Sequence, residues 1–176
     1  MKNAMNTILQ IAYVVEDLQA SMQHWARHMG VGPFFTIEHM PIHGAMYRNQ
    51  PSNPDLSYGL GFSGSVQIEL IQQHDDRPSI YREILAGRSS GYHHVWNRVR
   101  DFRKSVADFE AAGCPTVFTG TVTGAGRFAY LDTTKLFGGF VEIMDIEPGL
   151  LRAWTAAEEV AANWDGKQLT LPFPAF

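Results

Sequence analysis

Four side chains that could bind a metal ion interrupt short apolar segments of the sequence: Gln10, Glu69, His94 and Glu142. Successive side chains of a β-strand point to opposite faces, so each polar residue shares its face with apolar neighbours. Burying a carboxylate in such a place is costly unless it is paired or bound to a cation. Two carboxylates, one amide and one imidazole suit a divalent ion of octahedral preference, or zinc with expanded coordination.

Taken singly, each of these residues has an ordinary structural explanation. A glutamate in a strand usually faces solvent on an open sheet, and a lone histidine beside a core is more often structural than a ligand. The interpretation as one shared site therefore depends on whether the four residues follow a common pattern.

That pattern is an internal repeat. Residues 9–17 align without a gap on residues 93–101, which places Gln10 over His94. Glu69 and Glu142 each stand in the last apolar segment of their half, flanked by branched residues that point the other way. Beyond the first segment the match continues in the same register, with Leu18 over Phe102, Ser21 over Ser105, Met22 over Val106 and Trp25 over Phe109. We interpret the four residues as converging on one cation.

Each half is expected to open with a strand and a helix. The strands, at 7–15 and 92–99, run into Asp17 and Asp101, whose carboxylates can cap the following helices. Apolar residues then recur at helical spacing, and glycines 30 and 113 fit the ends of the helices. Further strands are expected near 34–40, 44–49, 57–63 and 65–72, and near 115–119, 126–131 and 139–146.

The chain is expected to divide into two modules, a linker and a C-terminal extension. Residues 1–75 form the first module, 76–90 a linker with a short helix around 79–86, and 91–147 the second module. Residues 148–176 form a final helix, which begins near a proline, and an extended tail. The apolar side of this helix is expected to cover the sheet or a partner subunit.

Composition excludes several classes of protein. The chain has 176 residues, 45% of them hydrophobic, which is enough for a compact folded domain. A net charge of −4 and the lack of a Lys/Arg cluster argue against a nucleic-acid partner, and no apolar run is long enough for a membrane span. The single cysteine, Cys114, favours a reducing, cytoplasmic location.

Four further residues are expected to contact a substrate. Trp96 and Arg98 follow His94 at intervals of two, so strand alternation places them on its face, and Phe140 and Met144 flank Glu142 in the same way. Arg98 could equally balance the buried glutamates or reach solvent. The pocket is therefore expected to be mostly apolar, for a small molecule with an apolar part. The same alternation predicts that His93 faces away from His94.

The segments around the four candidate ligands resemble the vicinal oxygen chelate superfamily, which includes glyoxalase I, methylmalonyl-CoA epimerase, extradiol dioxygenases and bleomycin-resistance proteins. The resemblance covers about residues 6–147. It implies an α+β fold with two tandem βαβββ modules, which form a cupped, barrel-like mixed sheet with helices outside. The resemblance rests on Gln10-Ile-Ala-Tyr-Val-Val-Glu-Asp-Leu, Ile68-Glu69-Leu70, Gly91-Tyr-His-His94-Val and Phe140-Val-Glu142-Ile.

The ligand set is most similar to that of animal-type glyoxalase I, which has Gln, Glu, His and Glu at these places. Epimerases of the superfamily share the His and the second Glu, but commonly carry His at position 10 and Gln at position 69. Members that use glutathione tend to carry basic residues where this chain has Val14 and Ser90. The resemblance therefore does not identify a glutathione or coenzyme A carrier.

The resemblance implies a metal-dependent isomerase, epimerase or lyase that moves a proton on carbon next to a carbonyl or thioester through a stabilised enolate. Glu142 would be the main base and Glu69 its partner on the other face. The metal would be divalent, namely zinc, nickel, cobalt, manganese or magnesium, and the protein a homodimer. Three alternatives stay open: a structural ion, a bleomycin-resistance-like binding protein without chemistry, and an iron-dependent extradiol dioxygenase.

Overall fold

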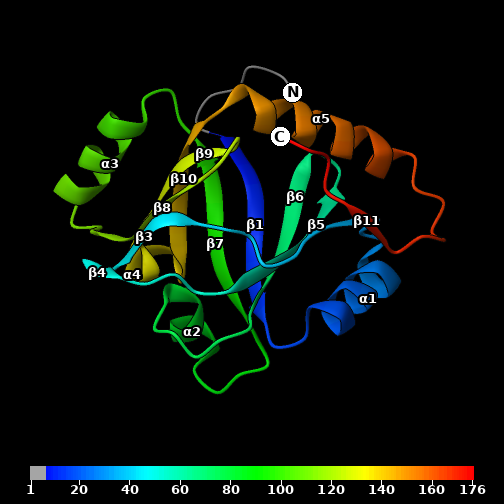
Figure 1. Ribbon diagram of the computed structural model, residues 1–176, viewed down its shortest axis with the longest axis horizontal. Coiled ribbons are helices and arrows are strands. Elements are labelled where there is room, and N and C mark those ends of the chain that lie inside the picture. The colour runs from blue at the N-terminus through cyan, green and yellow to red at the C-terminus, as the bar shows by residue number, and fades with distance from the viewer. Residues whose placement is uncertain (1–6) are drawn as a thin grey trace.

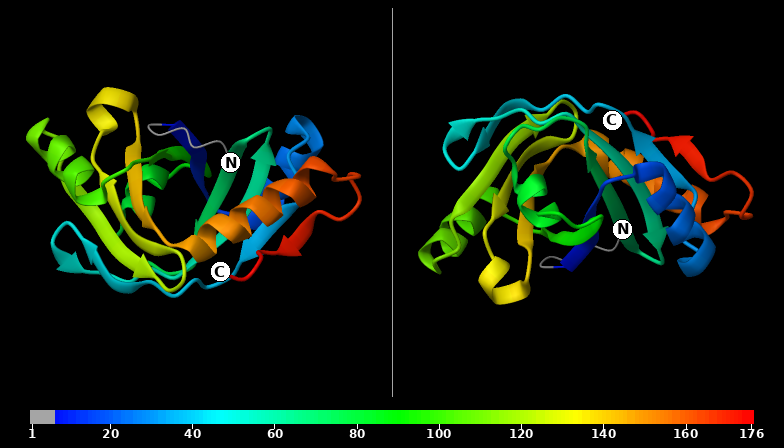
Figure 2. Two further views of the ribbon diagram at one scale, coloured as in Figure 1. Left: turned by 90° about the horizontal axis from the view of Figure 1, so that it is seen from above. Right: turned by 90° about the horizontal axis from the view of Figure 1, so that it is seen from below.

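A single, strongly curved mixed sheet dominates the computed structural model, which describes residues 7–176 (Figures 1 and 2). Its eleven strands lie in the order β11-β2-β5-β6-β1-β7-β10-β9-β8-β3-β4, and its two ends do not pair with each other. This is the cupped α+β sheet expected from the sequence. None of the helices in the described range is long and apolar enough to span a membrane.

One arrangement of strands occurs twice. In the first half, β1 (Thr7–Val15) pairs in parallel with β6 (Val66–Gln73), followed outward by β5 (Leu56–Ser63) and β2 (Phe34–Ile37). In the second half the corresponding strands are β7 (Ser90–Arg98), β10 (Phe140–Ile146), β9 (Gly126–Leu131) and β8 (Thr116–Val122). The first strands of the two halves, β1 and β7, pair antiparallel at the centre of the sheet. The polar residues of both halves therefore meet on neighbouring strands.

The first half also sends a hairpin across to the second. After β2 the chain crosses to the second half, where β3 (His43–Tyr47) and β4 (Gln50–Pro51) form a hairpin and β3 pairs antiparallel with β8. The two ends of the curved sheet are thus connected by chain that belongs to the first half (Figure 2). The extended segments at 34–40 and 44–49 were expected, but their distribution to opposite ends of the sheet was not.

Two helices cover the outer face of the sheet. Helix α1 (Leu18–Met29) packs Leu18 and Met22 against the outward residues of β6. Helix α3 (Phe102–Ala111) lies in the equivalent place over β9 and β10. Both begin as expected, because Asp17 accepts a hydrogen bond from Ala20 N (2.8 Å) and Asp101 from Lys104 N (2.9 Å).

The inner face is covered by helices from outside the repeat. The short helix α2 (Ile80–Leu85) inserts Tyr81 into the inner core, and α5 (Pro148–Ala162) crosses one end of the sheet and buries Trp154 (Figure 1). Trp154 contacts Phe62 and Trp96 edge-on, with ring centroids 5.4 and 5.3 Å apart. The expectation that the helices lie outside the sheet therefore holds for α1 and α3 but not for α2 and α5, because the inner face also carries apolar surface that must be covered.

The C-terminal tail adds one more edge strand. After α5 the chain turns back, and β11 (Thr170–Pro172) pairs in parallel with β2. The remaining helix, α4 (Thr134–Phe137), is one turn between β9 and β10 and leaves Leu136 and Phe137 exposed. The final helix thus covers this chain's own sheet, which is one of the two alternatives expected for it.

The helix caps give a direct test of the fold. We expect Asp101→Ala to lower the free energy of unfolding by about 1 kcal/mol, because the first turn of α3 loses its side-chain acceptor. Asp101→Asn keeps an acceptor and should stay within a few tenths of a kcal/mol of the wild type. Urea unfolding followed by circular dichroism measures both. Equal midpoints for the wild type and the alanine variant would show that the cap does not stabilise α3.

Candidate active site

The four candidate ligands come together on the inner face of the sheet, where Gln10, Glu69 and Glu142 approach the ring of His94. Nε2 of His94 lies 3.2 Å from Oε1 of Gln10, 3.1 Å from Oε2 of Glu142 and 3.5 Å from Oε2 of Glu69. All four side chains are buried. Gln10 and Glu69 come from strands of the first half, and His94 and Glu142 from strands of the second.

Three oxygens directed at one ring nitrogen are more than a neutral imidazole can satisfy. Its Nε2–H can donate one hydrogen bond, and Nε2 without hydrogen is itself an acceptor. Oε2 of Glu69 is buried and has no hydrogen-bond partner. Donors around one metal ion, bound at about 2.0–2.2 Å, are themselves about 3.0–3.4 Å apart, close to the distances seen here. The donor set therefore fits a divalent cation.

The side chains hydrogen bond to one another in this structure. Nε2 of Gln10 donates to Oε1 of Gln67 (2.6 Å) and to Oε1 of Glu69 (3.3 Å). Within residues 7–176 no three His, Cys, Asp or Glu side chains form a group that could hold a metal ion in their present positions. A metal ion bound here would therefore require these side chains to move from their present positions.

Two β-bulges set the direction of the ligands. In the β1–β7 pairing, Gln10 is opposite Trp96 and Ile8 is opposite Asn97, so Leu9 has no partner. At the other end of the pairing Ala12 is opposite His94 and Tyr13 is opposite Tyr92, which leaves His93 without one. The unpaired residue thus immediately precedes a candidate ligand in both halves. A bulge turns consecutive side chains toward the same side of a sheet.

The bulge makes one sequence-based expectation wrong. His93 does not face away from His94: its Nδ1 lies 2.7 Å from Nδ1 of His94, and its ring is fully buried on the inner face. The His93 ring stacks on Tyr81, with centroids 4.7 Å apart and planes 11° from parallel. Burial, and then the neighbouring His94, hold the pKa of His93 well below its usual value, so the ring is neutral. A neutral His93 can accept the Nδ1–H of His94 and leave Nε2 of His94 directed at the glutamates.

Burial also makes the negative charge of Glu69 unfavourable. Desolvation is the main cause and repulsion by Glu142 the second, and together they raise the pKa of Glu69 well above its usual value. The hydrogen bond from Gln10 opposes this shift only in part. A nearby cation would favour the charged form.

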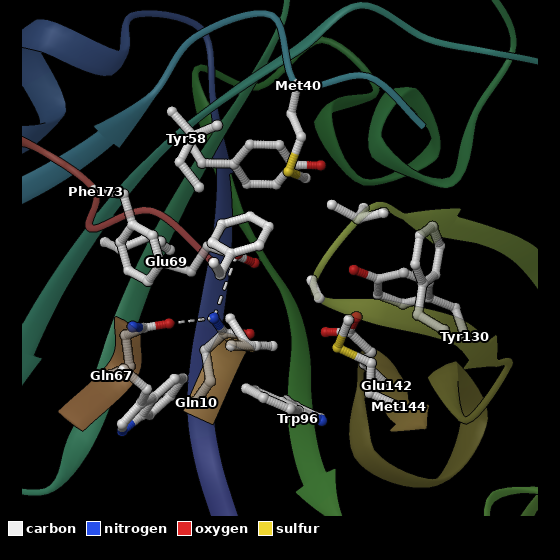
Figure 3. A pocket seen from close by; sticks show the side chains of 18 of the residues that line it. Gln10, Met40, Tyr58, Gln67, Glu69, Trp96, Tyr130, Glu142, Met144 and Phe173 are labelled. Carbon is white, nitrogen blue, oxygen red and sulfur yellow. Dashed lines mark hydrogen bonds between the residues drawn. The ribbon is translucent and has the colours of Figure 1, made fainter. Parts of the chain in front are cut away.

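A mostly apolar cavity lies against these carboxylates (Figure 3). Trp96 and Met144, two of the expected substrate contacts, line it together with Gln10, Glu69 and Glu142. The other two, Phe140 and Arg98, are not among the described residues that line the cavity. Phe140 packs against the ring of His93, with centroids 5.3 Å apart, and Arg98 is half-buried near the end of β7.

Several cavity residues were not expected from the sequence. Gln67 precedes Glu69 by two residues on β6, so strand alternation alone could have indicated it. The tyrosines of the wall come from separate elements, and the aromatic residues of the C-terminal tail lie more than 30 positions beyond Glu142, so no local pattern connected them with the site. These additional residues are Tyr58, Tyr81, Tyr130, Trp154, Phe173 and Phe176.

Comparisons with known proteins agree with this architecture. A sequence profile described as "Glyoxalase/Bleomycin resistance protein/Dioxygenase superfamily" matches residues 9–130, a range that includes Gln10, Glu69 and His94 and ends before Glu142. No curated protein matches the chain.

Solved structures with the same fold include methylmalonyl-CoA epimerase from Mycobacterium tuberculosis, at 18% identity and a TM-score of 0.59, covering 86% of this chain and 96% of that one. A Streptomyces coelicolor methylmalonyl-CoA epimerase variant in complex with 2-nitronate-propionyl-CoA has 18% identity, a TM-score of 0.55 and coverages of 82% and 99%. A hypothetical protein from Bacillus halodurans C-125 has 14% identity, a TM-score of 0.56 and coverages of 78% and 92%. At these identities the likeness concerns the fold alone.

The buried charge of Glu69 predicts a pH-dependent stability. Because the pKa of Glu69 is higher in the folded than in the unfolded protein, its contribution to stability is fully present below the unfolded-state pKa. This stability is lost as the pH rises through the folded-state pKa, where the buried side chain becomes charged. In the presence of a chelator, we therefore expect Glu69→Gln to melt at a higher temperature than the wild type above neutral pH. The difference should vanish near pH 4.

Thermal unfolding from pH 4 to 9 measures this difference, with the exposed Glu159→Gln as the control that shows no such trend. A Glu69→Gln variant that melts at or below the wild-type temperature at every pH would show that the carboxylate does not destabilise the metal-free protein.

Proposed function

Because the chain belongs to the glyoxalase/bleomycin resistance protein/dioxygenase superfamily, we propose that it is a metal-dependent isomerase, epimerase or lyase of the glyoxalase I type. It would move a proton on carbon next to a carbonyl or thioester. The observation that carries this proposal is the pair of buried carboxylates, Glu69 and Glu142, both directed at one imidazole beside an apolar cavity.

Gln10, Glu69, His94 and Glu142 would hold a divalent ion, which when bound polarises a substrate carbonyl and stabilises the negative charge that develops on its oxygen. His94 would keep its place because Nδ1 is held by His93. Gln10 would be held by its hydrogen bond to Gln67. His94 and Gln10 would thus be held in position by hydrogen bonds to His93 and Gln67 while the reaction proceeds.

Glu142 is the proposed base, and Glu69 its partner for the opposite face of the substrate. A base must come within about 2.6–3.2 Å, heavy atom to heavy atom, of the group whose proton it takes. Both carboxylates border the cavity and are largely shielded from water. Burial raises the pKa of Glu69, which makes it a stronger base than an exposed carboxylate. When two carboxylates approach one carbon from opposite sides, one can accept the proton from one face while the other, initially protonated, donates its own proton to the opposite face.

The fold neighbours support this reaction class. Some of the epimerases among them are solved with methylmalonyl-CoA or with 2-nitronate-propionyl-CoA. We propose the glyoxalase I type because of the ligand set. Gln10 and Glu69 match the residue types of glyoxalase I at these positions, whereas the epimerases commonly carry His and Gln there.

A second candidate is a binding protein without chemistry. The aromatic and aliphatic walls of the cavity favour it, because such walls alone can retain an apolar ligand. A protein of this kind has no need for two buried carboxylates beside a histidine. Metal content therefore distinguishes the two candidates.

We expect the purified wild type to contain about one equivalent of a divalent metal and to catalyse exchange of a carbonyl compound's α-hydrogen with deuterium oxide. Glu142→Gln should lower the exchange rate at least 10²-fold, since a positioned general base contributes about 10²–10⁴-fold. His94→Ala should lose the metal. Elemental analysis and proton NMR measure these two quantities.

Asp145→Asn is the matched control, because Asp145 lies on the same strand as Glu142 but is exposed and paired with Arg127 (2.9 Å). It should retain both metal and exchange. Wild-type protein without stoichiometric metal would overturn the enzyme proposal and leave the binding protein as the better account.

His93 provides a separate test of the metal site. We expect His93→Phe to weaken metal affinity about 10–100-fold, because it keeps an aromatic ring against Tyr81 but removes the acceptor for Nδ1–H of His94. His93→Gln offers an acceptor and should recover part of the loss. Competition with a chelator of known affinity measures this. Unchanged affinity in the phenylalanine variant would exclude a role for His93 in holding the ligand.

A further inference from the structure

The C-terminal segment narrows the cavity beside the carboxylates. Trp154 of α5 packs on Trp96 at the inner end, while Phe173 and Phe176 line the cavity from the tail. The tail is attached to β2, where Phe34 N donates to Leu169 O (2.8 Å) and Phe173 N to Thr36 O (3.2 Å). The ring of Phe173 also packs edge-on against Phe35. This part of the wall is thus a fixed component of the fold.

The remaining space is small. The cavity measures about 90 Å³. Sites for drug-sized ligands are typically ~300–1,000 Å³, and an apolar cavity of ~150 Å³ holds benzene. Met40 and Met144 line the space, and their unbranched side chains can adjust by an atom or two. A molecule of about benzene's size, with six non-hydrogen atoms, is therefore near the upper limit of what this cavity can enclose.

The cavity offers nothing to a negatively charged group outside the proposed metal site. Among the described residues that line it there is no lysine, arginine or histidine, and its two ionisable carboxylates are Glu69 and Glu142. Phosphate and carboxylate groups are bound in proteins by charged donors, most often arginine. A carrier with several phosphates or carboxylates would have to be desolvated here against apolar walls and like charge.

Two buried N–H donors of wall residues, Nε2 of Gln67 and Nε1 of Trp96, have no hydrogen-bond partner among the described residues. Buried N–H groups are rarely left unpaired, because each then costs about 1–3 kcal/mol. Figure 3 shows Gln67 and Trp96 on either side of Gln10 at the floor of the cavity. A bound molecule with carbonyl or hydroxyl oxygens would satisfy these donors once side-chain rotation brought them to face the cavity.

We propose that the substrate is a small, uncharged carbonyl compound that binds whole beneath the C-terminal segment, and not a thioester of a charged carrier such as coenzyme A or glutathione. This inference rests on the proposed function, since it names the substrate class of the same site. It departs from those fold neighbours that are solved with a coenzyme A compound.

The test compares two isomers of equal size, 3-hydroxybutan-2-one, which is neutral, and isobutyric acid, which is ionised to isobutyrate at neutral pH. Methylmalonyl-CoA serves as the large charged ligand. Ligand-observed NMR with the full-length, chelator-treated protein gives the three dissociation constants without any need for turnover. We expect 3-hydroxybutan-2-one to bind at least tenfold more tightly than isobutyrate, and methylmalonyl-CoA not to compete with it.

A paired variant tests the role of the tail. Removing both rings in Phe173→Ala/Phe176→Ala should strengthen binding of acetophenone, a bulkier neutral ketone, at least tenfold relative to the wild type. Leu136→Ala, exposed on α4, is the control and should change nothing. Near-ultraviolet circular dichroism checks that the double variant keeps its fold. If it does not, the isomer comparison on the wild type decides alone.

Binding of methylmalonyl-CoA at least as tightly as 3-hydroxybutan-2-one would overturn the inference, and exchange of its α-hydrogen would still support the proposed function. Selective binding of the neutral isomer by a protein that holds no metal and exchanges no hydrogen would support the substrate class and overturn the proposed function. Equal binding of the two isomers would also overturn the inference, because charge would then not matter in the cavity.

Discussion

The central constraint on this molecule is the concentration of negative charge on the floor of an apolar cavity. Two glutamates and an amide oxygen approach Nε2 of one histidine within 3.5 Å, and one of the glutamate oxygens has no partner. Buried carboxylates are tolerated when a proton or a cation compensates them. A cation at this point relieves repulsion between the glutamates and also makes the site reactive, so stability and chemistry have the same origin.

The duplication of the sheet brings the four candidate ligands together. Each half places one ligand on its first strand and one on its last, and these strands lie next to one another at the centre. The two bulges, at Leu9 and His93, come directly before the first-strand ligands. In the first half the bulged residue is an aliphatic core residue, whereas in the second it is a histidine that contacts the ligand. The halves thus share a framework but differ in how they support the metal site.

Much of this could be predicted from the sequence. Gln10 and His94 interrupt apolar strands at equivalent points of a visible repeat, and burial of Glu69 and Glu142 follows from strand alternation. Alternation failed at His93, because a bulge shifts the register by one residue and leaves no mark in the local pattern. It also placed Arg98 and Phe140 with the substrate contacts, although neither is among the described residues that line the cavity. The tail aromatics could not be assigned, since their contacts with the site depend on long-range pairing of β11 with β2.

The most direct test of the account is anomalous diffraction from crystals of the full-length protein, recorded on both sides of the absorption edge of the metal that the protein contains. The account predicts one strong peak about 2.0–2.2 Å from Nε2 of His94 and from an oxygen of each of Gln10, Glu69 and Glu142. A peak held by other residues, or none near His94 in protein that contains stoichiometric metal, would contradict it.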